Sequence, residues 1–370
     1  MALRFEPFAD THIPAVQAFN ARIASAVPYS VGTSPVGQRA SSERSSVWIE
    51  TMLVLDGDDV RGSVMLQHQE LEVGGEKHHS VNIQLPISEG LIDRRYAYLG
   101  MWIIQRVTAE YPFAFGVGMG GLAQPLPRLL SALGWETRLA PFLYFVHRPA
   151  RFLREMPLLR QSTARRLGAD IGAWSGVGHV AVRAAQAARR VKRSRTRGLT
   201  ATRVDEWGPW ADEIWSSARL SSSAISVRSS RALRALYPLS AERVLGFRLS
   251  DRGRDVGWTA LIATKMSGSD KFGNLYVGTM LDALALPGYE RAVADSVRRL
   301  FDDIGTDLSI ANHSHATWVD ALRGAGFFTG PSNYVVAMSK NLSAASRAAR
   351  PDGADRIHVT RGDGDGRLHL

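Results

Sequence analysis

The chain has 370 residues, 45% of them hydrophobic, and its 45 Lys and Arg against 35 Asp and Glu give a formal net charge of +10. That length suits two domains with a core each. The absence of cysteine excludes disulfides, thiolate metal sites and a cysteine nucleophile. No apolar run reaches the ~18–20 residues of a membrane span, and the N-terminus has no apolar signal region, so we expect a cytoplasmic protein.

The first half of the chain predicts a helix, then strands, then alternating strands and helices. A helix is expected where Ile13, Val16 and Phe19 recur with helical spacing. The elements that follow are a hairpin of strands 52–55 and 62–68 around the turn 56–59, a strand at 80–86, a helix at 92–111, a glycine-rich turn at 115–121, a helix at 125–133 and a strand at 141–146.

Residues 151–198 are expected to form a basic helical linker, with helices at 160–171 and 180–191. Between Arg183 and Arg197 there are many Arg and Lys residues and no acidic residue. The simplest interpretation is a helix that packs its Ala/Val face on a domain and leaves the arginines in solvent. A peripheral contact of 180–197 with an anionic membrane stays open. Nucleic acid is disfavoured as a partner, because no base-reading motif accompanies the charge.

The second half repeats the order of the first, as expected for two copies of one domain. Its elements are a helix around Ile214 and Trp215, strands 244–249 and 256–263 around Asp251-Arg252-Gly253, a strand at 274–286, a helix at 289–304, a strand at 308–312, a helix at 317–322 and a strand at 332–338. The sequence therefore predicts α+β domains at 1–150 and 199–342, each with a largely antiparallel mixed sheet flanked by helices, and a tail at 343–370.

Two motifs of the second half carry a family resemblance. Asp282 to Arg291 reads as a strand followed by a Pro-Gly-Tyr-Glu-Arg turn, and Asn312, Trp318 and Gly326-Phe327 follow at characteristic spacing. This arrangement resembles the GNAT acyltransferase superfamily, in particular its two-domain members, some of which are grouped with FemAB-like transferases. The resemblance implies an acyltransferase that takes acyl-CoA as donor and acts on an amine.

The same resemblance places the donor's pyrophosphate at the start of the helix after the fourth strand, where glycine and helix amides bind phosphate. In the first half this stretch offers Arg94, Arg95 and Gly100, whereas the second half has Arg291 to Asp295 without a glycine. We therefore expect the donor in the first domain, with the amides of Gly118, Gly120 and Gly121 lining the site. A tight strand–helix connection explains these last glycines equally well.

Glu89 and Tyr334 are the candidate catalytic groups. Glu89 follows the fourth strand of the first half and could act as general base toward an amine; alternatively it is a helix-start residue behind Ser88. For Tyr334, the resemblance implies the acid that reprotonates the leaving thiolate, and the alternative is an aromatic core residue.

The acceptor side is expected at Asn312, His313, Trp318 and Asn333. No metal is expected, because His313 and His315 have no third ligand at metal spacing. The carboxylates of the Asp- and Gly-rich tail could hold a cation or cap a basic site, but the tail is expected to be flexible or loosely packed. The function predicted is N-acyl or aminoacyl transfer to an amine of a small molecule or a cell-surface sugar or peptide precursor. The alternative is a non-catalytic binding or scaffold protein, because neither donor loop has the standard pattern.

Overall fold

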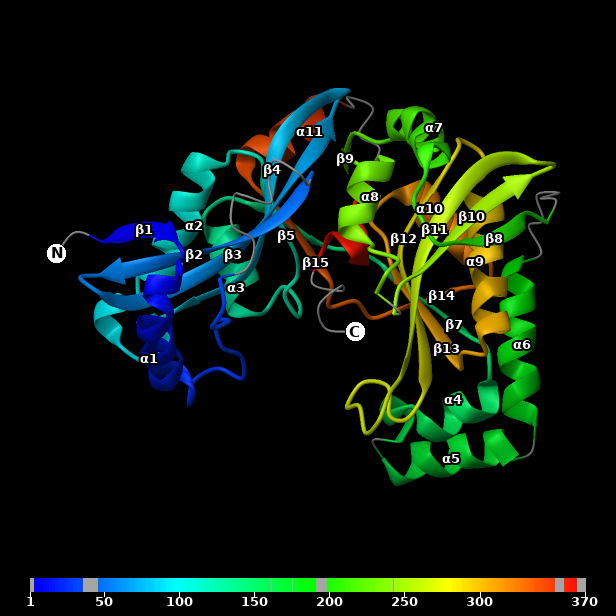
Figure 1. Ribbon diagram of the computed structural model, residues 1–370. Helices are drawn as coiled ribbons and strands as arrows, with labels where there is room; N and C mark the ends of the chain where they lie inside the picture. Colours follow the sequence, from blue (N-terminus) through cyan, green and yellow to red (C-terminus); the bar gives the residue numbers. More distant parts are fainter. Residues whose placement is uncertain are drawn as a thin grey trace. The chain divides into compact units, whose positions relative to one another are not determined.

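The structure is a computed structural model that describes residues 3–35, 46–160, 162–174, 176–190, 198–241, 243–349 and 356–364. The chain forms two units (Figure 1). Unit 1 comprises Met1–Leu139, Ala224–Val227 and Val335–Pro351, and unit 2 comprises Ala140–Ser223, Arg228–Tyr334 and Asp352–Leu370. Each unit is a mixed sheet flanked by helices, which confirms the predicted α+β class.

The sheet of unit 1 has the strand order β1-β2-β3-β4-β5-β15-β6, and β9 pairs with β3. All neighbours are antiparallel except β4 and β5. The strands are β1 (Arg4–Pro7), β2 (Val47–Asp56), β3 (Asp59–Val73), β4 (Glu76–Ser88), β5 (Ala114–Gly118), β6 (Glu136–Leu139), β9 (Ala224–Ser226) and β15 (Val335–Met338). The predicted hairpin turn lies between β2 and β3, where Gly57 supplies a φ of 64°.

Helices cover both faces of this sheet. Val16 and Phe19 of α1 pack with Leu53 and Leu55 of β2 on one face. Ile103 of α2 packs on the other face, where the alternate strand residues point. The helices of unit 1 are α1 (Ile13–Ile23), α2 (Leu99–Glu110), α3 (Pro125–Ala132) and α11 (Lys340–Ala348), with 3-10 turns at Asp10–His12, Glu89–Leu91 and Arg94–Tyr96.

The helix expected at 92–111 begins later than predicted. Two 3-10 turns precede α2, and a Cβ on Gly90 would lie 2.4 Å from the carbonyl oxygen of Tyr96, so the chain folds tightly back on itself there. Asp93 accepts a hydrogen bond from the amide of Arg95 and caps the second turn.

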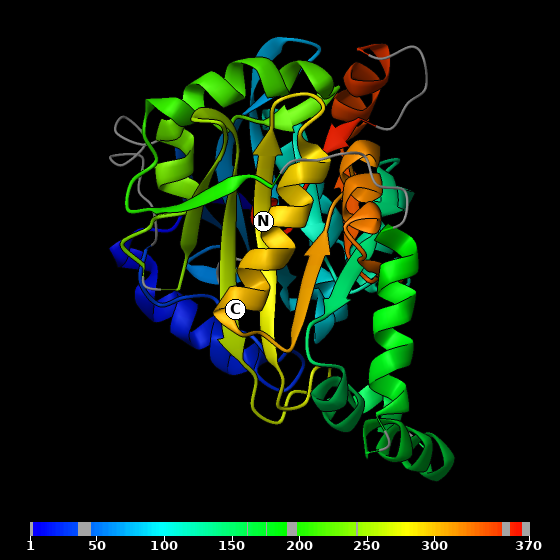
Figure 2. The same cartoon turned by 90° about the vertical axis from the view of Figure 1, so that its right-hand side faces the viewer.

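The sheet of unit 2 has the order β14-β7-β13-β12-β11-β10-β8, with β12 and β13 as its parallel pair. Its strands are β7 (Phe142–Val146), β8 (Thr200–Val204), β10 (Leu245–Asp251), β11 (Arg254–Lys265), β12 (Tyr276–Ala285), β13 (Leu308–Asn312) and β14 (Phe328–Gly330). Helix α9 lies across one face, as Figure 2 shows. Val293 of α9 would clash with a Cβ on Gly257 of β11. Trp258 follows Gly257 in the strand and packs against Trp207 on the opposite face of the sheet.

The segment expected as a linker forms three helices of unit 2. Two of them, α5 and α6, were predicted from the sequence, and α4 was not. The bounds of the helices of unit 2 are α4 (Pro149–Glu155), α5 (Thr163–Trp174), α6 (Val177–Arg190), α7 (Pro209–Ala218), α8 (Ser230–Leu236), α9 (Glu290–Ile304) and α10 (Ala316–Gly324), with 3-10 turns at Pro157–Arg160, Arg219–Ser221 and Arg361–Asp363. Residues 191–197, which hold most of the basic side chains of the run from Arg183 to Arg197, lie outside the described part of the chain.

The two halves of the sequence exchange their final strands. β7, from the first half, pairs with β13 of unit 2, while β15, from the second half, lies between β5 and β6 of unit 1. The units are therefore assembled from segments that are not contiguous, whereas the repeat in the sequence suggested contiguous domains at 1–150 and 199–342. Both final strands are short and apolar, so the sequence pattern alone suits either sheet.

The tail prediction is wrong for the described part of the C-terminal segment. Residues 340–348 form α11 of unit 1, and residues 356–364 pack into unit 2 with a short strand, β16 (Ile357–His358). Thr360 and Asp363 are fully buried there. Packing overrides the local flexibility that the Asp- and Gly-rich composition suggests; residues 365–370 lie outside the described chain.

Candidate functional site

The parallel strands of unit 1 separate soon after they pair. β4 and β5 pair only at Val81 with Ala114 and Asn82 with Phe115, although β4 continues to Ser88 and β5 to Gly118. Beyond that point each strand keeps its outer partner, β3 or β15. Beyond Asn82 and Phe115 the inner edges of the two strands no longer pair with each other, and we call this region the wedge.

A β-bulge bends β4 at this wedge. The register between β3 and β4 shifts after Ser63, and Leu85 takes a φ of 44°, which is rare for a residue other than glycine. Unit 2 has a matching irregularity, because the register between β11 and β12 shifts between Ala260 and Leu261. In unit 2, however, the parallel pairing extends to Met280, opposite that irregularity. The wedge of unit 1 thus opens earlier along its strand.

The predicted donor residues of unit 1 lie at one end of its central strands. Because β4 and β5 are parallel, their C-terminal ends lie on the same side of the sheet, and both the start of α2 and the turn after β5 follow these ends. At α2, Tyr98 is the N-cap and makes no side-chain capping bond, so no side chain of this cap engages the first amides of the helix. Arg94 and Arg95 are exposed just before it, and Arg95 pairs with Asp93.

The glycine-rich turn after β5 has an unusual backbone. Gly118, Met119, Gly120 and Gly121 all have positive φ, at 90°, 60°, 74° and 117°. Four such residues in a row strongly favour glycine. Gly100 differs, because a Cβ there would meet only Leu129, at 3.7 Å, in ordinary contact. Gly100 is therefore not required by the packing of unit 1.

Glu89 is held in a buried ion-pair cluster. One carboxylate oxygen accepts from Arg22 Nε at 2.5 Å and the other from Arg61 Nη1 at 2.8 Å, and the residue is 3% exposed. Arg61 also stacks over Tyr96, whose hydroxyl donates to Asp56. The carboxylate that the sequence offered as a base thus ties α1 and β3 to the loop before α2.

In unit 2, the place where β12 and β13 separate is occupied by the C-terminal segment. His313 forms an antiparallel bridge with Thr360, directly after β13. The amide of Ser314 donates to the carbonyl of Val359 at 3.0 Å, and the amide of Val359 donates back to Ser314 Oγ at 2.8 Å. The segment takes up backbone groups that the end of β13 would otherwise leave unpaired.

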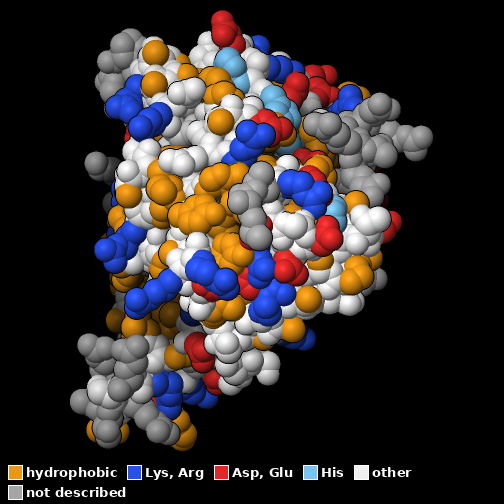
Figure 3. Space-filling view, turned by 90° about the vertical axis from the view of Figure 1, so that its left-hand side faces the viewer, with side chains coloured by type: hydrophobic (Ala, Val, Ile, Leu, Met, Phe, Trp, Pro, Cys, Tyr) orange, Lys and Arg blue, Asp and Glu red, His pale blue; other side chains and the backbone are white. Residues whose placement is uncertain are grey.

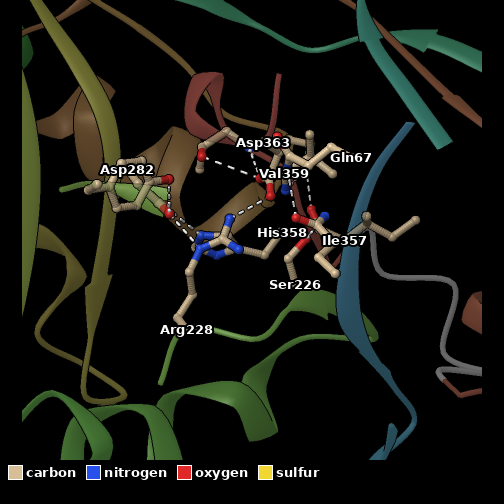
Figure 4. Close-up of polar contacts among 12 residues, drawn as sticks. Gln67, Ser226, Arg228, Asp282, Ile357, His358, Val359 and Asp363 are labelled. Carbon is tan, nitrogen blue, oxygen red and sulfur yellow. Dashed lines mark hydrogen bonds and ion pairs between the residues drawn. The ribbon is translucent and has the colours of Figure 1, made fainter. Parts of the chain in front are cut away.

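A buried charge cluster fixes this segment against β12 (Figure 4). Arg228 donates to Asp282 of β12 at 2.5 Å and to Asp363 of the tail at 2.6 Å, and all three side chains are fully buried. His358 lies 3.5 Å from Asp282. Tyr237 donates to the same carboxylate at 2.8 Å. A Cβ on Gly362 would lie 1.9 Å from the Tyr237 hydroxyl, so only glycine fits there.

The charges in this cluster shift each other's pKa. Burial alone would raise the pKa of Asp282, but the Arg228 guanidinium and the hydrogen bonds from His358 and Tyr237 hold it well below its usual range. Burial would lower the pKa of Arg228, but Asp282 and Asp363 outweigh it and raise that pKa. Burial, with His358 and His315 nearby, lowers the pKa of His313 well below its usual value.

The residues expected on the acceptor side also lie in unit 2, but three of the four are buried in its interior. His313 stacks on Trp318 with ring centroids 5.3 Å apart, and Asn312 donates to the carbonyl of Pro141 at 3.2 Å. Asn333 is exposed. Tyr334 donates to the carbonyl of Thr360 at 3.2 Å and so anchors the tail. The structure brings His313 and Tyr334 together around the tail, away from solvent.

No sequence pattern pointed to Arg228, whose side chain joins the tail to β12 in unit 2. An arginine in a loop reads as a surface residue, since buried arginines are rare. The one available signal was Asp282, a charged residue inside an otherwise apolar strand.

No protein-family model matches the sequence, and no curated protein matches it significantly. Solved structures do match its fold. A probable N-acyltransferase from Enterococcus faecalis V583 aligns with 91% of this chain and 72% of its own length, at a TM-score of 0.51 and 10% identity. A GCN5-related N-acetyltransferase from Anabaena variabilis gives the same four values. Saccharomyces cerevisiae N-myristoyltransferase with bound myristoyl-CoA covers 91% of this chain and 78% of its own, at a TM-score of 0.51 and 10% identity.

These neighbours show that the chain has the two-domain GNAT-like fold expected from its motifs. A likeness at this identity is a likeness of fold. Within the described residues, no helix combines the length and the apolar character needed to cross a membrane.

Proposed function

We propose that this protein is an N-acyltransferase that binds acyl-CoA in the wedge between β4 and β5 of unit 1. The observation that carries the proposal is the difference between the two units. In unit 1, β4 and β5 stop pairing at Asn82 and Phe115 while both strands continue. In unit 2, the corresponding place is filled by the protein's own tail, through Ser314 and Arg228.

The wedge suits the chemistry of coenzyme A. The pantetheine arm is extended and carries two amides, which can pair with an unpaired strand edge as an added strand does. Its pyrophosphate would lie at the start of α2, where the first amides and the helix dipole favour an anion and Arg94 and Arg95 add positive charge. The amides of Gly118, Gly120 and Gly121, at the same edge of the sheet, are the proposed lining of the site.

Transfer requires a neutral amine to attack the thioester carbonyl and the carbon–sulfur bond to break, and the proton released by the amine nitrogen ends on the leaving thiolate as the free thiol of coenzyme A. Backbone N–H groups at the diverging strands would stabilise the oxyanion that forms. Glu89 is better placed to position the loop than to take a proton, because both of its oxygens are paired with arginines. Tyr334 holds the tail in unit 2 through Thr360. We therefore propose structural roles for both residues.

The acceptor is an amine of a small molecule or of a cell-surface precursor, as FemAB-like relatives would use, with Asn333 as an exposed contact. A cytoplasmic location would give access to acyl-CoA. The rival proposal is a non-catalytic binding protein. Two observations favour this rival: the tail fills the place where β12 and β13 separate in unit 2, and Glu89 is paired with arginines. The rival predicts no acyl-CoA binding by either unit.

Titration calorimetry with acetyl-CoA and with free coenzyme A tests the donor site. We expect the wild type to bind both ligands. The double variant Arg94→Glu/Arg95→Glu should weaken binding about tenfold or more, because two charge reversals at the start of α2 repel the pyrophosphate. Both side chains are exposed, so the fold should be retained.

The matched control is Arg231→Glu/Arg254→Glu, which makes the same change of charge at two exposed positions of unit 2. It should bind like the wild type. Equal weakening in both double variants would mean that only net charge matters and would remove the site at α2. No binding by the wild type would favour the non-catalytic proposal.

A further inference from the structure

Helices α5 and α6 of unit 2 form a hairpin (Figure 2), and this hairpin carries several exposed apolar side chains. Trp174, at the end of α5, is 88% exposed, and Val177, at the start of α6, is 68% exposed. Further exposed apolar residues follow with helical spacing on each helix: Leu167, Ile171 and Val180. A group of exposed apolar side chains with this spacing is typical of an interaction site.

The packing of the hairpin explains why these side chains stay exposed. α5 and α6 meet through glycines, since a Cβ on Gly178 would lie 2.7 Å from the carbonyl oxygen of Gly172 and 2.5 Å from Leu153 of α4. Helices α4, α5 and α6 therefore approach each other closely at these glycines. Trp174 and Val177, next to these glycines in the sequence, remain mostly exposed.

The outward face of α6 is also apolar, contrary to the sequence-based expectation for this helix. One stripe of α6 contacts the rest of unit 2. Val182 packs against a core cluster, Arg183 and Gln186 donate to the carbonyls of His147 and Val146, and Arg189 lies over the ring of Phe328. The remaining Ala and Val positions, including Val180 and Ala184, face solvent. The Ala/Val face thus does not pack on the domain.

The net charge of the protein is concentrated in the same segment. Twelve of the chain's 45 Lys and Arg residues, but only two of its 35 Asp and Glu residues, lie from Arg151 to Arg197. This segment therefore carries the entire net charge of +10, and the rest of the chain is balanced. In keeping with that balance, Figure 3 shows Lys and Arg side chains spread among Asp and Glu side chains on one face.

We propose that the α5–α6 hairpin docks on the surface of an anionic lipid bilayer, with Trp174 and Val177 inserted at the level of the headgroups. An exposed Trp, neighbouring aliphatic residues and a basic flank are the combination that binds such interfaces. Each Lys or Arg near an anionic surface contributes about 1 kcal/mol, and the apolar side chains add to this by leaving water.

Charge separates this partner from two others. A second copy of the chain would bring two segments of +10 together, which repel. A nucleic acid would use the charge but leave Trp174 and Val177 in water. A bilayer with acidic headgroups accounts for both features. Docking there would place an acyltransferase beside lipid-linked or cell-surface acceptors, but it requires no acyl-CoA binding and can fail or succeed independently of the proposed activity.

Co-sedimentation of the full chain with phosphatidylglycerol-rich vesicles tests the proposal. We expect the protein to pellet with these vesicles, to pellet much less with phosphatidylcholine vesicles, and to be released as salt approaches about 1 M, where screening is strong. Trp174→Glu/Val177→Glu should lower the partition coefficient about tenfold or more. Both side chains are mostly exposed, so the fold should tolerate the change.

Leu220→Glu is the control, because Leu220 is 60% exposed in unit 2 but lies outside the hairpin. It should pellet with the anionic vesicles like the wild type. The proposal is overturned if the wild type stays in the supernatant, or if Trp174→Glu/Val177→Glu pellets as well as Leu220→Glu. Equal binding to DNA by the wild type and the double variant, without vesicle binding, would assign the charge to a nucleic acid.

Discussion

A fragment ending at residue 150 is expected not to fold on its own. Unit 1 takes β15 from the second half of the chain, and without it β5 and β6 lose the strand that lies between them. The fragment would also carry β7, whose partners β13 and β14 are absent. Exposed strand edges of this kind favour aggregation over folding. Circular dichroism and thermal melting of the purified fragment would show no cooperative transition.

A cut at a different place provides the control. If a protease site is placed within residues 191–197, cleavage should leave two pieces that co-purify, because each unit still receives its exchanged strand. A fragment 1–150 that melts cooperatively, or cleaved halves that separate freely under native conditions, would contradict the exchange of strands.

Arg228→Met is expected to be the most damaging single substitution in unit 2. The guanidinium is the shared partner of Asp282 and Asp363, and all three groups are fully buried. Its removal leaves two carboxylates without their counter-ion, which typically costs about 3–5 kcal/mol. Chemical denaturation at neutral pH should show a loss of this size, and limited proteolysis should release the segment 356–364.

The loss should depend on pH in a defined direction. In the wild type the folded-state pKa of Asp282 lies below its unfolded value, so the pair's contribution is fully present above about pH 4 and falls as pH drops through the folded pKa. In Arg228→Met, burial without the guanidinium raises the pKa of Asp282, so protonation relieves the unpaired charge. The difference between variant and wild type should therefore shrink from pH 7 toward pH 4.5.

Arg323→Met is the matched control, because Arg323 pairs with Asp320 at 3.6 Å while both side chains are exposed. Such a surface pair contributes less than about 1 kcal/mol. Similar losses in Arg228→Met and Arg323→Met, or a loss in Arg228→Met that does not change with pH, would mean that the buried cluster does not secure the tail.

Local patterns in the sequence predict most elements of this fold. The turn at Asp56 to Asp59 and the one at Asp251 to Gly253 mark their hairpins, and helical spacing marks α9 within one residue of its start. The exchange of β7 and β15 could not be predicted in this way. Which sheet a strand joins depends on contacts far along the chain, and both strands offer the same short apolar pattern.

The candidate site was predictable only in part. The charge and glycine at residues 94–100 pointed to unit 1, and the structure places them at the edge where β4 and β5 separate. The wedge itself depends on where the parallel pairing of β4 and β5 ends, and no local sequence pattern predicts that position. The paired state of Glu89 depends on Arg22, 67 residues away in sequence. The closure of unit 2 depends on Asp363, in a segment whose composition suggests a loose tail.

Hydrogen–deuterium exchange with and without acetyl-CoA tests whether the donor binds in unit 1, because it reports on backbone amides in both units at once. A donor site in unit 1 predicts new protection in residues 83–89, at the start of α2 and in the turn 118–121, where donor and backbone would pair. Residues 280–286 and 312–314 of unit 2 should not change, since the tail already occupies their site. Protection confined to unit 2, or none in either unit, would contradict a donor site in unit 1.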